Sequence, residues 1–249
     1  MIYRLTLAIL LFSYEANSQE SIPLPVGDCD VPKPLHDYRH CNFNGRDLSG
    51  ADLAGSLLNG VNLQNTKLFD CNLKGAILID ADLKWAMLSG CNAAEADFSQ
   101  SDLFHTNFDE ADVTDAVFFK ANLFGASMNS TSADGASFQH ANLKDISMEE
   151  SQFTHCSFDQ AFMMRAVLID SNLTDSSMRQ VVLTGAALEH ANFTRTDLTG
   201  SLLNGTTLTE TIFHNAILTS ARFTNARIQA PDFTGAIDIP TDIPIENHK

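Results

Sequence analysis

The sequence predicts an all-β solenoid of stacked coils, and two observations predict it. An apolar residue recurs at every fifth position from Phe43 to Phe233, which makes 39 consecutive units, and it is large in all but three of them. A small residue, mostly Ala, Ser, Thr or Cys, lies two positions before each of them. An α-helix turns by about 500° over five residues, so these apolar positions would drift around its axis. A flat strand alternates with period two and would send them to opposite faces. The repeat therefore requires a bend after every five residues.

Each unit of five is expected to form a short strand fragment followed by a corner. The small and the large residue point inward together, because alternate residues of a strand share a face. The last two residues turn the corner, which agrees with glycine at Gly45, Gly50, Gly55 and Gly60. Four corners make a coil of 20 residues, and coils stack like parallel strands at about 4.8 Å. The 39 units therefore predict about ten coils.

A spacing of 20 residues is supported by the volumes of the inward side chains. It places four rings in one column, Phe98, Phe118, Phe138 and Phe158. The preceding column is small in the matching coils, which carry Ala93, Val113 and Ala133. Close packing requires this exchange of volume between neighbouring columns. Residues 20 apart are therefore expected to lie directly above one another.

The units written "ADL" at 51–53 and "ANL" at 121–123 resemble the pentapeptide-repeat family, whose shorthand is A(D/N)LXX, and the resemblance covers residues 41–235. It implies a right-handed quadrilateral parallel β-helix. Members that give fluoroquinolone resistance bind DNA gyrase by imitating duplex DNA with an acidic β-helix. The formal net charge of −16 agrees with that activity. Three features depart from it: a signal-like start, an unbroken register, and a tail without the apolar helix that dimerises those proteins.

The ends of the chain predict three further segments. Residues 1–18 have a positive Arg4, an apolar stretch and small residues ending at Ser18, which is typical of a cleaved signal peptide and predicts export to the periplasm or medium. The alternative is an apolar strand of a cytosolic protein. Residues 19–40 are proline-rich and predict a capping segment, with Tyr38 plugging the open end. Residues 236–249 predict a capping tail that lies as a short strand over the last coil.

The cysteines are interpreted mainly as buried residues. Cys41, Cys71, Cys91 and Cys156 occupy the small inward position, where each can replace alanine. Cys71 and Cys91 are 20 apart and should be stacked, close enough for a disulfide to be considered. A disulfide between Cys29 and Cys41 would pin the first segment onto the first coil. The run "HDYRH" at 36–40 matches no standard zinc spacing, so no metal site is predicted.

The sequence predicts neither an enzyme nor a cofactor. It contains no nucleophile elbow and no phosphate-binding loop, and the repeat itself explains its many carboxylates. The negative charge argues against direct nucleic-acid binding, and nothing after the first residues is long and apolar enough to span a membrane. A protein partner is expected, and small-molecule partners are not.

Two outward surfaces are candidates for that partner. Apolar residues at outward positions predict an interaction surface of Leu57, Ile77, Ile79, Val117, Phe119, Phe104, Phe124, Phe162 and Met164. An acidic ridge is predicted along one corner, formed by Asp70, Asp109, Glu110, Glu149, Glu150, Asp170, Glu189 and Glu210. The ridge is interpreted as a solvated face, with a cationic partner or DNA mimicry as alternatives. An outward column of Thr154, Thr174 and Thr194 is explained by β-propensity.

These observations favour an exported, non-enzymatic protein that acts as a rigid protein-binding or structural scaffold. The alternative function is a cytoplasmic DNA mimic that binds DNA gyrase or another topoisomerase. The two hypotheses differ first in the compartment of the mature protein.

Overall fold

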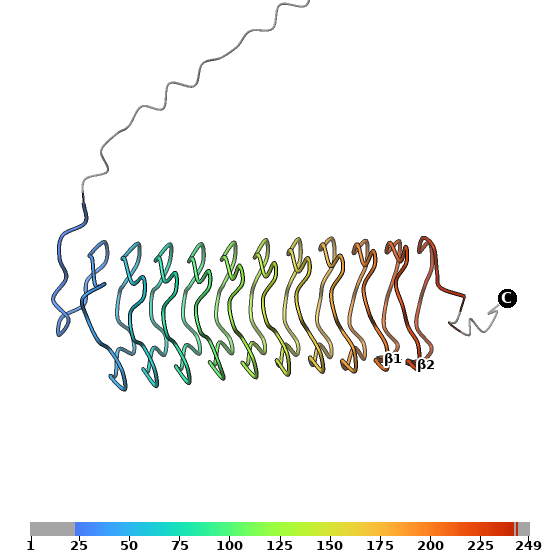
Figure 1. The fold of residues 1–249 in the computed structure, drawn as a ribbon, viewed down its shortest axis with the longest axis horizontal. Coiled ribbons are helices and arrows are strands. Elements are labelled where there is room, and N and C mark those ends of the chain that lie inside the picture. Colours follow the sequence, from blue (N-terminus) through green and yellow to red (C-terminus); the bar gives the residue numbers. More distant parts are fainter. Residues whose placement is uncertain (1–22, 242, 244–249) are drawn as a thin grey trace, which may run out of the picture.

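The computed structural model describes residues 23–241 and 243, which form one column of stacked coils (Figure 1). Parallel backbone bridges join each outward mid-side residue to the residue 20 positions later, from Asn42 with Asn62 to Ile217 with Ile237. A turn follows every fifth residue, so each coil has four sides. The predicted stacking at a spacing of 20 is confirmed.

Regular strands are short because the chain turns before a second bridge can form. In the described part of the chain they are limited to β1 (Thr207–Thr209) and β2 (Arg227–Gln229), labelled near the C-terminal end in Figure 1. The two strands pair in parallel, with Thr207 opposite Arg227. The other sides contribute single bridges to the same four columns.

Each corner is a tight turn with one residue in the left-handed region. At the first corner the backbone N–H of Arg46 donates to the carbonyl of Phe43 at 2.9 Å, and Gly45 between them has φ +69°. A positive φ at the third of four residues is the pattern of a type II turn. Glycine is not required, because Asp175 occupies the same place with φ +61°. The corner therefore accepts polar residues at a cost in backbone strain.

The Asn or Asp between the small and the large residue has a structural purpose. Its side chain accepts a hydrogen bond from the backbone N–H two residues later, as Asp47 Oδ1 does from Ser49 at 3.1 Å. This contact favours the turn that follows. The amide of Asn72 also donates to Asp52 Oδ1 one coil below, at 2.9 Å. The repeat consensus thus encodes both the corner and the contact between coils.

The core is a column of side chains, and its centre is the aromatic ladder. The rings of Phe98 and Phe118 are 5.0 Å apart and those of Phe118 and Phe138 are 4.8 Å apart, with interplanar angles of 4° and 2°. Phe158 continues the stack at 4.8 Å. These rings are fully buried, as are Ala93 and its neighbours in the preceding column. The predicted ladder is confirmed.

Small polar residues are tolerated inside because their hydroxyls are satisfied. Thr66 Oγ1 donates to the carbonyl of Phe43 at 2.8 Å, and Thr106 Oγ1 donates to that of Leu83 at 2.9 Å. Both hydroxyls reach the coil below and are buried. A buried hydroxyl with such a partner avoids most of its desolvation cost.

Tyr38 lies at the N-terminal end of the stack. The side chain is fully buried, its ring lies edge-on to Phe43 at 6.0 Å, and its hydroxyl donates to the carbonyl of Lys33 at 2.9 Å. Gly27 passes so close that an added Cβ would lie 2.0 Å from the Tyr38 ring. Asp37 bridges Leu57 in the regular register, so the stack begins one unit before residue 41.

The C-terminal end keeps the register as far as Ile237, which bridges Ile217. Beyond it we expected a strand, but residues 238–241 form no bridge, and the N–H of Ile243 donates to the carbonyl of Pro240 at 3.2 Å. Pro240 has no N–H to donate to a ladder, which disfavours pairing. Ile243 still packs against the core and is 5% exposed. The predicted signal peptide lies outside the described residues, as do residues 242 and 244–249 of the tail.

Two disulfides join neighbouring parts of the stack. Cys29 is bonded to Cys41 with a Cα separation of 5.7 Å, and Cys71 to Cys91 with one of 4.6 Å. The second pair replaces the interpretation of Cys71 and Cys91 as simple alanine substitutes, because the parallel register places their Cα atoms within disulfide range. Cys156 is a buried free thiol, and burial raises its pKa.

Candidate interaction surfaces

The apolar residues predicted as a partner surface all lie at outward positions, but they do not form one continuous patch. Leu57 and Ile77 are bridge partners on adjacent coils, whereas Asp97 separates Ile77 from Val117. Most are half-buried, and Phe162 is the most exposed at 39%. The role of these residues in binding therefore stays a prediction. The case for it is best where their side chains contact one another.

Direct contact occurs between Phe104 and Phe124. Their rings stack at 5.5 Å with an interplanar angle of 9°. Lys144 Nζ lies 5.4 Å from the centre of the Phe124 ring, a cation–π contact. On the neighbouring side Lys120 Nζ lies 5.0 Å from the Phe119 ring. The lysines thus cover part of these two aromatic surfaces.

Sequence reasoning missed the most exposed aromatic residue of the stack, Trp85. The Trp85 side chain is 50% exposed and stacks on the His105 ring at 4.4 Å, with Phe104 edge-on at 5.5 Å. We call Trp85, Phe104, His105 and Phe124 the aromatic corner. Trp85 has φ +59°, a backbone conformation that a bulky residue rarely adopts. The lone tryptophan at a corner position was the signal that could have found it.

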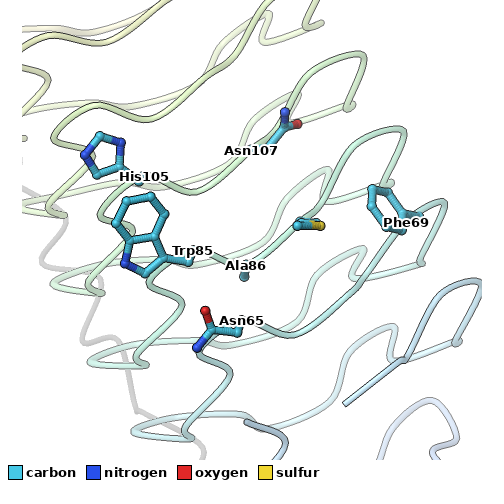
Figure 2. Close-up of a pocket in the computed structure, with 7 residues that line it drawn as sticks. Asn65, Phe69, Trp85, Ala86, His105 and Asn107 are labelled. Atoms are coloured by element: carbon cyan, nitrogen blue, oxygen red, sulfur yellow. The ribbon is translucent and has the colours of Figure 1, made fainter. Parts of the chain in front are cut away.

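A groove runs from the aromatic corner across the adjacent side of the stack (Figure 2). Its volume is about 380 Å³, and it is lined by Asn65, Phe69, Trp85, Ala86, Met87, His105 and Asn107. Trp85 and Phe69 lie on opposite sides of it, with Ala86 between them (Figure 2). Met87 is 43% exposed. The groove therefore offers two aromatic walls, an apolar floor and the amides of Asn65 and Asn107.

The acidic ridge follows the corner at the far edge of the same side. Its exposed members are stacked along one column, Asp70, Glu110, Glu150, Asp170 and Glu210. Glu210 lies 3.5 Å from His190 Nδ1. Among residues 23–241 and 243, the other four carboxylates have no Lys, Arg or His nitrogen within 4.0 Å. Phe69 of the groove directly precedes Asp70, so the ridge and the groove are contiguous.

The other predicted ridge residues lie at the same corner, one position before that column, and two of them have structural contacts. Asp109 Oδ1 accepts hydrogen bonds from Ser127 Oγ at 2.5 Å and from the N–H of Asn129 at 2.9 Å. Glu149 Oε1 accepts a longer one from Ser147, at 3.4 Å. Glu189 has a buried carboxylate oxygen that no described residue contacts by a hydrogen bond. The predicted ridge is therefore divided into exposed corner carboxylates and half-buried ones that support the coils.

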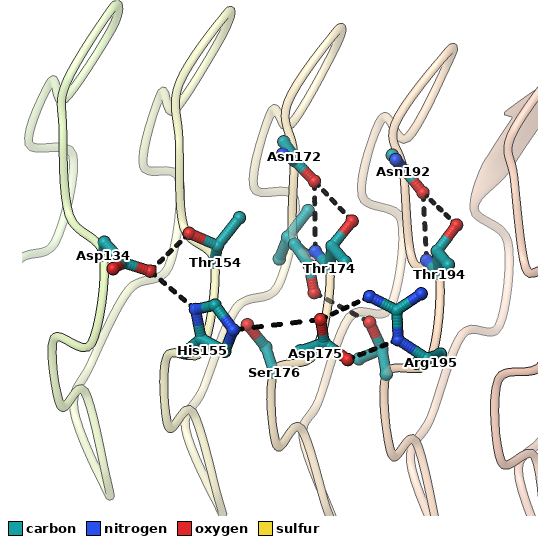
Figure 3. Close-up of polar contacts among 12 residues, drawn as sticks. Asp134, Thr154, His155, Asn172, Thr174, Asp175, Ser176, Asn192, Thr194 and Arg195 are labelled. Carbon is teal, nitrogen blue, oxygen red and sulfur yellow. Dashed lines mark hydrogen bonds and ion pairs between the residues drawn. The ribbon is translucent and has the colours of Figure 1, made fainter.

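Carboxylates on other corners are neutralised by arginines one coil away. Arg195 binds Asp175 through two hydrogen bonds of 2.6 and 2.5 Å (Figure 3). Arg165 binds Asp145 in the same way, through two hydrogen bonds of 2.6 Å. The hydrogen bonds from Arg195 lower the pKa of Asp175. His155 Nδ1 lies 2.8 Å from Asp134 Oδ1, a contact that raises the pKa of His155. Apart from Glu210, the exposed ridge carboxylates have no such partner among the residues that the structure describes.

The outward threonines form a column but not a free hydroxyl surface. Thr174 and Thr194 each donate to the Asn two residues earlier at 2.6 Å, and Thr154 donates to Asp134 at 2.5 Å (Figure 3). These hydroxyls therefore donate their hydrogen bonds within the protein.

Residues 23–241 and 243 contain no helix of the length and apolarity that crossing a membrane requires.

The family follows from the repeat itself. A profile described as "Pentapeptide repeats" matches eight copies between residues 39 and 229, which covers well over half of the chain. The chain is a pentapeptide-repeat protein. The matched ranges are residues 39–75, 66–103, 81–118, 96–132, 134–168, 146–185, 163–200 and 191–229.

Solved pentapeptide-repeat structures resemble this one. HetL from Nostoc sp. strain PCC 7120, described as involved in heterocyst differentiation regulation, is 25% identical over 80% of this chain and 88% of its own, with a TM-score of 0.41. A pentapeptide repeat protein from the Arabidopsis thaliana thylakoid lumen is 34% identical over 42% of this chain and 69% of its own, with a TM-score of 0.26. QnrB1, a plasmid-mediated fluoroquinolone resistance protein, is 15% identical over 76% and 89%, with a TM-score of 0.38. A search of curated proteins gives no match.

Proposed function

We propose that this pentapeptide-repeat protein is an exported, non-enzymatic scaffold that binds a protein partner at the aromatic corner and the adjoining groove. The observation that carries the proposal is Trp85, which is half-exposed at a corner where the backbone disfavours it and which walls a groove of about 380 Å³. Tryptophan is prominent among residues that dominate binding energy in protein interfaces. Strain retained at such a residue is typical of a functional position.

The charges around the groove indicate the chemistry of the partner. Asp70 and Glu110 are exposed at the edge opposite Trp85, and no described Lys, Arg or His nitrogen lies within 4.0 Å of them. A partner that inserts an apolar anchor between Trp85 and Phe69 would place basic residues against this edge. Such charge complementarity speeds association, and this effect becomes smaller as the salt concentration rises. The partner is therefore a protein with lysine or arginine beside an apolar anchor.

Binding is tested with purified protein in two steps. Partners are captured from the exported fraction and identified, and the affinity of the purified partner is then measured for the wild type and for a Trp85→Ser, Phe104→Ser variant. We expect the affinity to fall by about 30-fold, the loss of about 2 kcal/mol that defines a strong interface residue. A Thr174→Ser, Thr194→Ser variant on another side is the matched control and should bind normally. Equal affinity of the aromatic variant and the control would refute the proposed site.

Export is tested separately, by determining the first residue of the mature protein in each cell fraction. We expect the exported form to begin after Ser18, because small residues there are typical of a cleavage site. A cytoplasmic protein that starts at Met1 would contradict export without affecting the binding result.

A second candidate function is supported by the unpaired ridge carboxylates. A rigid column with exposed acids along one corner has the charge of a nucleic-acid mimic, and binding to DNA gyrase is the activity that the family resemblance suggests. We expect purified protein to leave gyrase supercoiling unchanged if the scaffold function is correct. Inhibition that disappears in an Asp70→Asn, Glu110→Gln variant would support the mimic instead.

A further inference from the structure

The two disulfides differ in how easily a reductant reaches them. Cys71 and Cys91 are both buried inside the coils. Cys29 belongs to the capping segment and is half-buried, while its partner Cys41 is buried at the first inward position. Thiol–disulfide exchange begins when a thiolate attacks one of the two sulfurs, so access helps to decide which bond reacts. In the folded protein, Cys29 is therefore the cysteine at which exchange begins.

His40 lies beside both sulfurs of the accessible bond. In the disulfide-bonded protein its Nε2 is 3.5 Å from Cys29 Sγ and 3.6 Å from Cys41 Sγ, and its side chain is exposed. Exchange is faster when the departing sulfur is stabilised as a thiolate, and a cation or an N–H donor beside that sulfur provides this stabilisation. Attack on Cys29 makes Cys41 the leaving group, and the His40 ring is in place to donate a hydrogen bond to it.

The capping segment depends on this bond because it buries few of its apolar side chains. Val26, Val31 and Leu35 are each more than half exposed. Arg46 of the first coil also holds the segment, because its Nη1 donates to the carbonyl of Cys29 at 2.7 Å. A segment with few buried apolar contacts opens readily, and a cross-link is what restrains it. Loss of the disulfide should therefore release the capping segment and leave the coils intact.

We propose that the Cys29–Cys41 disulfide is a thiol-exchange site, through which a dithiol reductant detaches the capping segment from the first coil. The Cys71–Cys91 disulfide does not react under the same conditions, so the coils keep their register. His40 is the group that stabilises the departing sulfur of Cys41. This proposal does not depend on the proposed function.

The exchange takes place in two steps. A thiolate of the reductant attacks Cys29 Sγ and forms a mixed disulfide, while the Cys29–Cys41 bond breaks and Cys41 Sγ leaves with the bonding electron pair. The second thiolate of the reductant then attacks the reductant's own sulfur in the mixed disulfide, and Cys29 Sγ leaves as a thiolate. The reductant is oxidised to a disulfide and gives up two electrons, which the two cysteines receive. Its two thiol protons pass through water to the cysteine sulfurs.

The first test compares the two disulfides in the full chain, oxidised, folded and kept without oxygen. Dithiothreitol is added at neutral pH, samples are alkylated at intervals, and peptide mass spectrometry follows each cysteine. We expect Cys29 and Cys41 to be alkylated roughly 100-fold faster than Cys71 and Cys91, because reduction of the buried bond must wait for the coils to open. Equal rates at the two disulfides would overturn the proposal.

The second test identifies the sulfur that is attacked and the role of His40. Glutathione, a monothiol, leaves a mixed disulfide that alkylation can trap, and we expect this adduct on Cys29 and the alkyl group on Cys41. The reverse pattern would refute the assignment of the leaving group. His40→Ala should slow reduction by dithiothreitol about tenfold. His140→Ala is the matched control, because His140 lies in the same corner column but away from both disulfides, and an equal rate for the two variants would exclude His40.

Hydrogen exchange tests whether the capping segment is released. After reduction, the amides of residues 26–35 should exchange faster, whereas those of the coils should stay protected. Cys29→Ser, Cys41→Ser should show the same fast exchange without a reductant, with circular dichroism as the check that the coils are folded. Cys71→Ser, Cys91→Ser should still respond to the reductant. Unchanged exchange of residues 26–35 in the reduced wild type would contradict the release.

Discussion

Replacing Phe118 with alanine removes one of the two inner rings of the aromatic ladder. The ring stacks between Phe98 and Phe138 at 5.0 and 4.8 Å and lies edge-on to Phe108 at 5.9 Å. All four rings are fully buried. The coils cannot close the resulting cavity easily, because backbone bonds to the coils above and below fix each side. The N–H of Phe118, for example, donates to the carbonyl of Ser137 at 2.7 Å.

The expected loss of unfolding free energy is about 3–5 kcal/mol, the usual cost of truncating a buried phenylalanine. The upper half of that range is favoured because each aromatic pair contributes about 0.5–1.5 kcal/mol beyond its buried area. The urea midpoint followed by circular dichroism measures the loss. Hydrogen exchange locates it, since in a repeat protein the effect should be greatest in the neighbouring coils.

Phe124→Ala is the matched control, because Phe124 is an outward aromatic that stacks on Phe104 and lies edge-on to His105 at the surface. We expect a loss of less than about 1.5 kcal/mol there, the value of an aromatic pair. If Phe118→Ala lowers the unfolding free energy no more than Phe124→Ala does, Phe118 does not point into the core. The argument from the volumes of neighbouring inward columns would then be wrong as well.

Three further predictions concern the corners and the contacts between coils. Trp85→Gly should change the unfolding free energy by less than about 1 kcal/mol, because relief of the positive φ offsets the lost stack; a loss of 3 kcal/mol in urea would make Trp85 a structural residue. Arg195→Gln should destabilise the protein at neutral pH and lose its effect in acid. The lowered pKa of Asp175 means that its contribution is present above its ordinary value of 3.8 and disappears as pH falls through the lowered one, which thermal melts from pH 7 to pH 2 would show. Cys71→Ser, which opens the disulfide to Cys91, should cost about 3 kcal/mol in non-reducing buffer and nothing after reduction of both proteins; an equal difference in both buffers would contradict the disulfide.

The candidate site shows the limit of prediction from the pentad. The outward positions of Phe104 and Phe124 follow from the repeat, and the structure brings these two together. Trp85 was missed because it lies at a turn position, where strand alternation says nothing about the direction of a side chain. Its stack on His105 depends on the rotamers of two corner residues. The groove beside the aromatic corner could therefore not be predicted from the inward and outward positions of the repeat alone.

The sequence by itself determined the bend after each five residues, the spacing of 20 and the inward columns. These features are local, and the chain repeats them so often that one register satisfies every unit at once. Only the tertiary structure decided which corner carboxylates have an arginine within reach and which cysteines are bonded. It also decided where outward aromatic rings meet. These contacts join side chains of different coils and columns, and their partners depend on side-chain direction, which a backbone periodicity leaves free.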